Sequence, residues 1–388
     1  MSRGIHLGRR QLILLKAGGI TALAFVLAQL LTVPFSASLT SIFSTPQKND
    51  FILSDFYAQV ADHRPVREVS DKIVMVDIGH HNREEIVSLL EVVRMCEPKA
   101  IGVDINFADP HEDDSGLLEF VASTPNVVFP LGLNSDAEDK ESFVVSEFPF
   151  FKDSVKNVKF GASNLPGKYA RSSIREFPVS FKLSDGSDLL SFVAGIASVA
   201  DPEKFSALTS RGADVEPIDY VSMVIPVMTY EDVFENPEPL IGKIVMVGAV
   251  DEASDMHATP VAQSMAGLNI HSYALSTILN GRYYRQLPQY VDYIVACCLC
   301  YLIVLISIGM TYKVKGLILR IVQVSLVYLS VRVGYALYVD YRVIANFSTT
   351  FLMVAFGPFA IDVWNGSLGL KEFVADRIWS PLRRLAKR

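Results

Sequence analysis

The chain has 388 residues, half of them hydrophobic, and a net charge of −7 at neutral pH. Residues 45–290 hold 37 acidic and 20 basic side chains, which excludes the basic surface that nucleic-acid binding requires. The hydrophobic residues are concentrated in four stretches with few charges, so the composition predicts a membrane protein that carries one long acidic segment.

The first apolar stretch, Ala17–Phe35, follows a basic N-terminal segment at residues 1–16. A membrane-spanning helix needs about 20 apolar residues, and this stretch is long enough. A cleaved signal peptide is an alternative, because small residues follow at 36–38. Its apolar run is longer than the roughly 7–15 residues of a typical signal peptide. We therefore predict an uncleaved transmembrane helix at 17–35.

The long segment at residues 45–287 begins with alternating strand and helix patterns. The predicted strands are Lys72–Asp77, Ala100–Phe107 and Asn126–Leu131, and the predicted helices between them are Arg83–Met95 and Asp113–Ser123. These strands are almost continuously apolar, as in parallel sheets that are covered on both faces. The fold class that we predict is therefore α/β, with a mostly parallel sheet.

In the rest of this segment the secondary-structure patterns are weak at first and become strong near its end. Phe177–Lys182 has the pattern of a strand, and Leu189–Val199 has that of a helix. Lys243–Val250 is a strong candidate for a buried strand. Leu268–Leu279 predicts a helix that leads toward the next apolar stretch.

Three further apolar stretches close the chain and predict transmembrane helices at Tyr293–Tyr312, Gly316–Val339 and Val343–Ile361. Basic residues gather before the first span, in the turn at 313–315 and in the tail at 362–388. Loops rich in Lys and Arg stay in the cytoplasm. Both termini are therefore predicted to be cytoplasmic, with the long acidic segment on the other side.

One charge lies deep inside a predicted span. Arg332 interrupts the third stretch, and an ionisable residue within a membrane helix is a functional candidate by default. The structural alternative is an ion pair with Asp340 or Asp292 near the outer surface. We favour the ion pair, and the sequence alone leaves both roles open.

Polar residues follow several of the predicted strands, where parallel sheets gather their ligands. The candidate ligand-binding residues are Asp77, Asp104, Asp109, His257, Thr259 and His271. The aspartates suit a metal or phosphoryl site, but an Asp at a strand end more often caps a helix or holds a turn. The histidines suit acid–base chemistry or structural hydrogen bonds. No phosphate-binding, nucleophile or zinc motif appears, so we expect no enzyme activity, cofactor or metal.

Several strings together resemble the CHASE type-2 family, extracytoplasmic sensory domains of bacterial membrane receptors. They are Ile101–Phe107, Leu240–Ala249, Asp255–Val261 and Ala266–His271, together with the run that ends at Asp77. The order of one span, an outer domain and three spans is also similar to the family. The resemblance implies a multi-pass protein of the bacterial inner membrane with a periplasmic sensory domain. A Trp-, Pro- and Arg-rich tract that many members carry after the first Asp is missing.

Family members usually continue into a kinase or cyclase domain, whereas a short tail follows the last span here. The resemblance therefore implies a sensor whose output lies on another membrane or cytoplasmic protein. A structural or scaffolding subunit of an envelope complex is the alternative, and an enzyme using Asp77, Asp104 and His257 is a third hypothesis. The expected partners are membrane lipid, an output protein, a small-molecule or protein ligand, and a second copy of the chain, but no nucleic acid.

Overall fold

The computed structural model describes residues 8–43, 52–64, 67–139, 141–165, 172–309 and 315–374. The chain divides into two compact units. The helical unit comprises Met1–Ile42, Ile52–Tyr57 and Arg285–Arg388. The α/β unit comprises Phe43–Phe51 and Ala58–Tyr284. The predicted cytoplasmic segments at 1–7 and 375–388 lie outside the described residues, as do 310–312 of the predicted second span.

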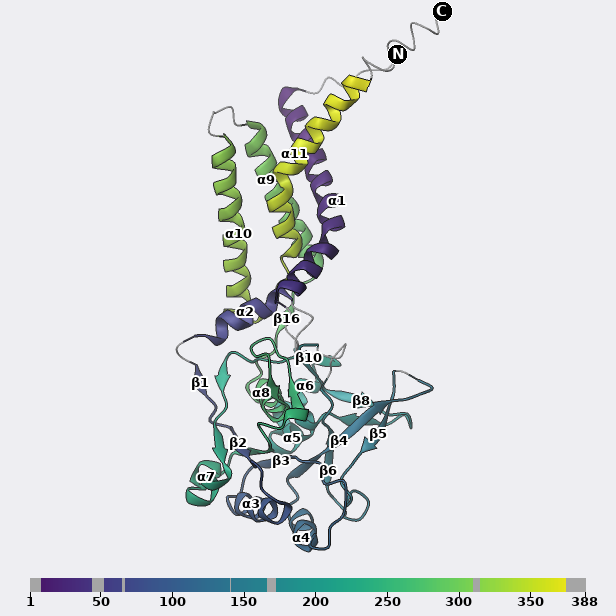
Figure 1. Cartoon of the computed structure of the whole chain (residues 1–388), viewed down its shortest axis with the longest axis vertical. Coiled ribbons are helices and arrows are strands. Elements are labelled where there is room, and N and C mark those ends of the chain that lie inside the picture. Colours follow the sequence, from purple (N-terminus) through teal and green to yellow (C-terminus); the bar gives the residue numbers. More distant parts are fainter. Residues whose placement is uncertain are drawn as a thin grey trace, which may run out of the picture. The chain divides into compact units, whose positions relative to one another are not determined.

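The α/β unit is built around a sheet whose neighbouring strands mostly run parallel (Figure 1). Among the described residues it has seven strands, in the order β12-β2-β13-β3-β4-β5, with β6 paired to β4. These strands are β12 (Val227–Thr229), β2 (Ile73–Asp77), β13 (Ile244–Gly248), β3 (Ala100–Asp104), β4 (Val127–Ser135), β5 (Phe143–Glu147) and β6 (Lys159–Ala162). Only β5 runs antiparallel to its neighbour. The predicted α/β class with a mostly parallel sheet is confirmed.

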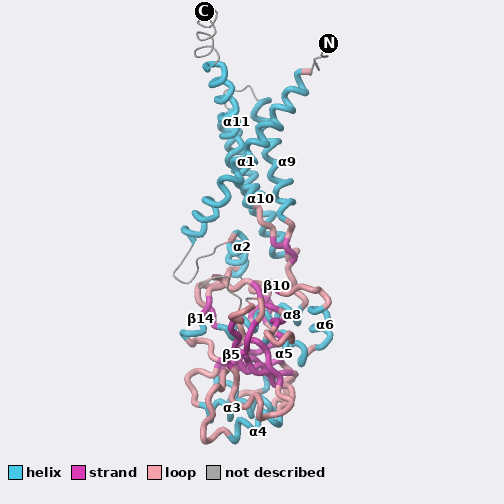
Figure 2. The backbone as a smooth tube through the Cα atoms, turned by 90° about the vertical axis from the view of Figure 1, so that its right-hand side faces the viewer, coloured by secondary structure: helices cyan, strands magenta, loops and turns pink. Residues whose placement is uncertain are grey.

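Helices cover both faces of this sheet, and Figure 2 shows the strands gathered between them. One face carries α3 (Arg83–Met95) and α4 (Ser115–Ser123), whose buried leucines share a hydrophobic core with alternate residues of β2, β3 and β13. The other face contacts α5 (Phe192–Ala200) and α8 (Gly267–Asn280). Because successive strand side chains point to opposite faces, each strand buries both of its rows.

Close packing on the second face depends on one glycine of β3. A Cβ atom at Gly102 would lie 2.4 Å from Cδ1 of Ile196 on α5 and 2.9 Å from the sulfur of Met246 on β13. A larger residue at this position would displace the side chains of Ile196 and Met246, so glycine permits the close approach of the helix to the sheet. Asp104 has the same parity along β3 as Gly102, so its side chain lies on the face that α5 and α8 cover.

Two of the predicted elements in the middle of the chain differ from the structure. Phe177–Lys182 forms two short strands with different partners, β7 (Glu176–Pro178) and β8 (Ser180–Lys182), rather than one. The helix predicted at Leu189–Val199 starts later, because β9 (Asp188–Leu190) occupies its first residues. Ser191 then caps α5 by accepting a hydrogen bond from the Ala194 backbone N–H.

Shorter elements complete the α/β unit. They are the strands β1 (Glu68–Val69), β10 (Val215–Pro217), β11 (Met223–Val224), β14 (Met256–His257) and β15 (Met265–Ala266), the helices α6 (Pro202–Thr209) and α7 (Tyr230–Glu235), and the 3₁₀ turns at Glu238–Leu240 and Ala253–Asp255. The helix α2 (Leu53–Asp62) begins in the helical unit and ends in the α/β unit. It is therefore one of the covalent links between them.

The helical unit contains long apolar helices. They are α1 (Arg9–Phe43), α9 (Gln289–Gly309), α10 (Lys315–Asp340) and α11 (Ser348–Val374). Small side chains of α1 and α9, among them Ala24 and Ala296, form a buried core with Leu352 and Met353 of α11. A Cβ at Gly19 would lie 2.7 Å from the Trp364 ring, so α1 and α11 pack closely there.

Within the described residues, three helices are long and apolar enough to cross a membrane: Arg9–Leu31, Gln289–Gly309 and Gly316–Asp340. The predicted count of four is not reached, because α11 does not meet these criteria. The fourth stretch also starts later than predicted. Val343–Ile344 forms the strand β17, which pairs with β16 (Arg285–Gln286), and the helix begins only at Ser348.

A buried acid fixes this helix start. Asp292 of α9 is 4% exposed and accepts hydrogen bonds from the backbone N–H groups of Thr349 (3.0 Å) and Thr350 (3.1 Å). The hydroxyl of Thr350 donates a third bond, at 2.7 Å. A carboxylate at a helix N-terminus satisfies free N–H groups and complements the helix dipole. Asp292 thus joins α9 to α11.

Candidate functional site

The carboxyl ends of three neighbouring strands lie level with one another. Gly248, the last residue of β13, pairs in register with Asp77 on β2 and with Asp104 on β3. Two aspartates therefore flank one glycine at the edge of the sheet where parallel α/β folds bind their ligands. The sequence prediction that these two residues share an edge is borne out geometrically, but their surroundings differ.

Asp77 holds the adjoining loops. Its Oδ1 accepts hydrogen bonds from the backbone N–H of Gly79 at 3.1 Å and from that of Val250 at 3.3 Å. Gly79 has a φ of +52°, in the left-handed region that favours glycine. The carboxylate thus holds a tight turn after β2 and the loop after β13, which is a structural task.

Asp104 has no such partners. No hydrogen bond or ion pair joins its carboxylate to another residue in the described part of the chain, although the side chain is half-buried. Burial raises the pKa of Asp104 above its ordinary value, while the nearby His271 acts in the opposite direction and Asp255 adds to the rise. Because this half-buried carboxylate has no hydrogen-bond partner in the described part of the chain, it remains available to a ligand.

A cavity of about 570 Å³ opens beside Asp104. Its charged and amide lining residues are Asp104, Asn106, Glu147, Glu252, Asp255 and His271. They come from the ends of β3 and β5, the loop after β13, and α8. The cavity has the size of a small-molecule site and lies at the carboxyl edge of the sheet. We call it the acidic pocket.

His271 is the most enclosed polar residue of the acidic pocket. It is 5% exposed and packs edge-on against Phe192, with ring centroids 5.4 Å apart. No hydrogen bond joins its ring to any residue that the structure describes, and its nitrogens are not among the fully enclosed unpaired atoms. The ring nitrogens therefore reach the cavity, where they are free to contact a ligand.

The N-terminal end of α8 supports one wall of the acidic pocket. Asp255 accepts a hydrogen bond from the Gly267 backbone N–H at 3.0 Å through Oδ2 and contacts Nε2 of His257 at 3.2 Å through Oδ1. A Cβ at position 267 would lie 2.4 Å from Oδ2, so any larger residue would displace this carboxylate. His257 thus contacts Asp255 and does not line the pocket.

The other predicted site residues are structural or lie elsewhere. Thr259 is buried, and its hydroxyl exchanges hydrogen bonds with the backbone of Ala262, which closes a turn. Asp109 is exposed, and its backbone carbonyl accepts a bond from Arg83 at 2.8 Å. Of the six candidates, only Asp104 and His271 are brought together in the acidic pocket.

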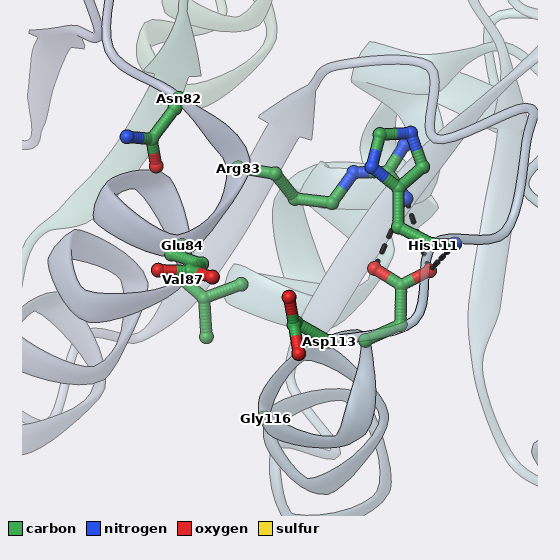
Figure 3. A pocket seen from close by; sticks show the side chains of 8 residues that line it. Asn82, Arg83, Glu84, Val87, His111, Asp113 and Gly116 are labelled. Atoms are coloured by element: carbon green, nitrogen blue, oxygen red, sulfur yellow. Dashed lines mark hydrogen bonds and ion pairs between the residues drawn. The ribbon is translucent and has the colours of Figure 1, made fainter.

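A second cavity, of about 470 Å³, lies between the N-terminal ends of α3 and α4 (Figure 3). Arg83 points across it and pairs with both carboxylate oxygens of Asp114 at 3.0 Å. The backbone N–H of His111 donates to the same carboxylate at 2.6 Å. Asp114 is 5% exposed, and its charge is fully compensated. Because Arg83 and Asp114 already pair with each other, this cavity is the weaker candidate for a ligand-binding site.

Sequence reasoning missed Glu147 altogether. It ends β5, whose hairpin with β4 returns it to the edge of the parallel strands. A Cβ at Gly132 would meet the Glu147 side chain at 2.8 Å, so this glycine lets the glutamate lie flat over β4. No strand or motif pattern marks this position in the sequence. The described residues contain no group of three His, Cys, Asp or Glu side chains that could hold a metal ion.

The predicted ion pair of Arg332 with Asp340 or Asp292 is not seen among the described residues. Asp292 is committed to the N-terminus of α11, whereas Arg332 is exposed on α10. Neighbouring positions on the same helix, Tyr328 and Leu329, are 65% and 55% exposed. The guanidinium thus lies on a side of α10 that the described helices leave open.

Comparison with known proteins identifies a family. The family model of the CHASE2 domain matches residues 77–308, which extend from the end of β2 into α9. No curated protein and no solved structure matches the chain.

Proposed function

The chain belongs to the CHASE2 family of extracytoplasmic sensory domains, and on that basis we propose that it is a membrane sensor that acts through a separate protein. The observation that carries the sensory role is the acidic pocket. It combines a ligand-sized volume with two polar side chains that line it, the half-buried Asp104 and the buried His271, and neither has a hydrogen-bond partner among the described residues. Polar groups that face a cavity and are not paired within the protein are available to fix a ligand.

The proposal includes four membrane spans in the inner membrane of a bacterium. The described residues of α11 support this count, because Leu352, Met353 and Ala360 pack into the same core as α1 and α9. The Lys and Arg residues at both ends of the chain support cytoplasmic termini and a periplasmic α/β unit.

The α/β unit acts in this proposal as a binding module, not as an enzyme. General-base activation of a nucleophile needs the base within hydrogen-bonding reach of it, directly or through one water. His271 makes no hydrogen bond to a Ser, Cys or Thr side chain in the described part of the chain. Signalling then follows from a shift between conformations that ligand binding favours unequally.

The output partner contacts α10 in this proposal. A guanidinium in contact with hydrocarbon is costly, so an exposed Arg within a span favours a protein neighbour with a complementary acidic or polar group. Arg332 meets this description, and the exposed Tyr328 is one helical turn away. A partner that pairs with Arg332 would receive the signal directly from the helical unit.

The test uses the full chain in its native membrane. We would place a photoreactive amino acid at Tyr328 and compare the cross-linked products with and without the substitution Arg332→Leu. The proposal predicts a cross-link to a different protein that disappears in the Arg332→Leu chain. Cross-links to lipid alone in both chains would contradict it, and cross-links to a second copy alone would indicate an oligomer without a separate partner.

Ligand sensing is tested separately with the full chain in lipid nanodiscs. A broad panel of small anions, cations, sugars and peptides would be screened by thermal shift. A ligand at 100 times its Kd stabilises the state that it binds by about 2.7 kcal/mol, which is readily measured. Silence across the panel would favour the alternative role as a scaffolding subunit.

A further inference from the structure

The charges that line the acidic pocket are strongly one-sided. Four carboxylates, those of Asp104, Glu147, Glu252 and Asp255, face a single histidine, and no Lys or Arg lines the cavity in the described part of the chain. An anionic ligand would be repelled by these carboxylates. The pocket is therefore suited to a cation.

Two of the four carboxylates already have partners. Asp255 caps α8 and pairs with His257, and Glu252 accepts a hydrogen bond from the Ser254 hydroxyl at 2.9 Å. Asp104 and Glu147 differ from them, because neither makes a hydrogen bond or an ion pair with any described residue. Asp104 is half-buried and Glu147 is exposed, so these two carboxylates remain available to a ligand.

The surroundings of Asp104 indicate which kind of ligand would compensate its negative charge. Its carboxyl group is held in a poorly hydrated place, and burial raises its pKa. A positive charge placed beside the ionised form would offset this desolvation penalty. His271, 5% exposed and without a hydrogen-bond partner among the described residues, offers a second polar contact at the same wall.

The cation has to be larger than a bare metal ion. Divalent metals need several oxygen or nitrogen ligands at about 2.0–2.6 Å from one point. No three His, Cys, Asp or Glu side chains in the described residues converge in this way. Dispersed carboxylates around about 570 Å³ suit a molecule that carries its charge on an organic frame.

We propose that the acidic pocket binds a small organic amine whose ammonium charge is balanced by Asp104 and Glu147. This inference rests on the proposed sensory function and names the class of its ligand. The remaining polar atoms of the amine contact His271 and Asn106, which line the same cavity. Because the pairing is electrostatic, affinity falls as the ionic strength rises.

The test is titration calorimetry on the full chain in nanodiscs of zwitterionic lipid. The probes are putrescine, ethanolamine and choline, with succinate, glucose and Mg²⁺ as an anion, a neutral molecule and a metal. We expect at least one amine to bind. The substitution Asp104→Asn should weaken its binding at least tenfold, and Asp104→Asn with Glu147→Gln should abolish it.

One matched substitution serves as the control. Asp113→Asn removes a carboxylate from the second cavity and leaves the acidic pocket untouched. It should change the affinity for the amine less than threefold. Hydrogen exchange of β3 and α8 in every variant shows whether the fold is retained.

Three results would overturn the amine assignment. They are unchanged amine binding in the Asp104→Asn/Glu147→Gln chain, equal binding of Mg²⁺ at the same site, and failure of all three amines to bind. If the amines fail while succinate or glucose binds, the amine class is wrong and the sensory function stands. If nothing binds here or in the broad thermal-shift panel, the sensory function fails as well.

Discussion

Asp77 and Asp104 occupy equivalent places and do different work. Each ends a parallel strand, and each is in register with Gly248 on the strand between them. Asp77 accepts two backbone hydrogen bonds and holds the loops after β2 and β13. Asp104 has no hydrogen-bond partner in the described chain and faces a cavity. Equivalent positions in a sheet therefore do not imply equivalent functions, because the next loop decides which carboxylate is satisfied.

The largest expected effect comes from removing the satisfied aspartate. Asp77→Ala leaves the N–H groups of Gly79 and Val250 without an acceptor and should destabilise the α/β unit by about 2 kcal/mol, since a hydrogen bond to a charged group contributes roughly 1.5–3 kcal/mol. Hydrogen exchange of these two amides in the full chain measures the effect. Asp104→Ala is the matched control, and an equal loss of protection in it would remove the distinction.

A smaller loss of stability is expected from a substitution next to Asp255, which lines the acidic pocket. Gly267→Ala would place a Cβ 2.4 Å from Oδ2 of Asp255 and displace the carboxylate that caps α8. The loss of such a cap costs about 1 kcal/mol. Urea unfolding of the full chain measures it. Gly116→Ala in α4, whose Cβ would meet Val87 at an ordinary 3.4 Å, is the control and should not destabilise.

The smallest expected effect is a gain in stability, not a loss, and its size depends on pH. The pKa of Asp104 is raised above its ordinary value of 3.8, so the folded state holds this proton to a higher pH than the unfolded state. Stability therefore falls as the pH rises from about 4 through the raised pKa. Asp104→Asn removes this loss and should melt at a higher temperature than the natural chain at neutral pH. The difference should vanish below about pH 4.

Melting temperatures between pH 4 and pH 8 test this dependence. A difference between Asp104→Asn and the natural chain that stays constant over the whole range would contradict it. A destabilised variant at neutral pH would show that Asp104 has a structural partner, as Asp77 does. Either result would remove the proposed difference between Asp77 and Asp104.

The sequence by itself determined the class of the fold and the edge at which the site lies. Continuous apolar runs such as Ile73–Val76 and Ile244–Val247 cannot be solvent-exposed, so they specify strands buried on both faces. The predicted start of α3 at Arg83 also agrees with the structure, where Asn82 and Glu85 form a capping box from local residues. These features depend on neighbours in the sequence, which is why pattern reasoning finds them.

Tertiary structure decided which polar residues meet. Glu147 reaches the pocket through an antiparallel hairpin, and Asp292 caps a helix that starts 56 residues later, so neither contact leaves a local pattern. Asp77 and Asp104 likewise end strands of similar apolar sequence. Only Asp77 accepts a hydrogen bond from the loop after β13, through the backbone N–H of Val250. Long-range hydrogen bonds, not residue type, separate the structural carboxylates from those left for a ligand.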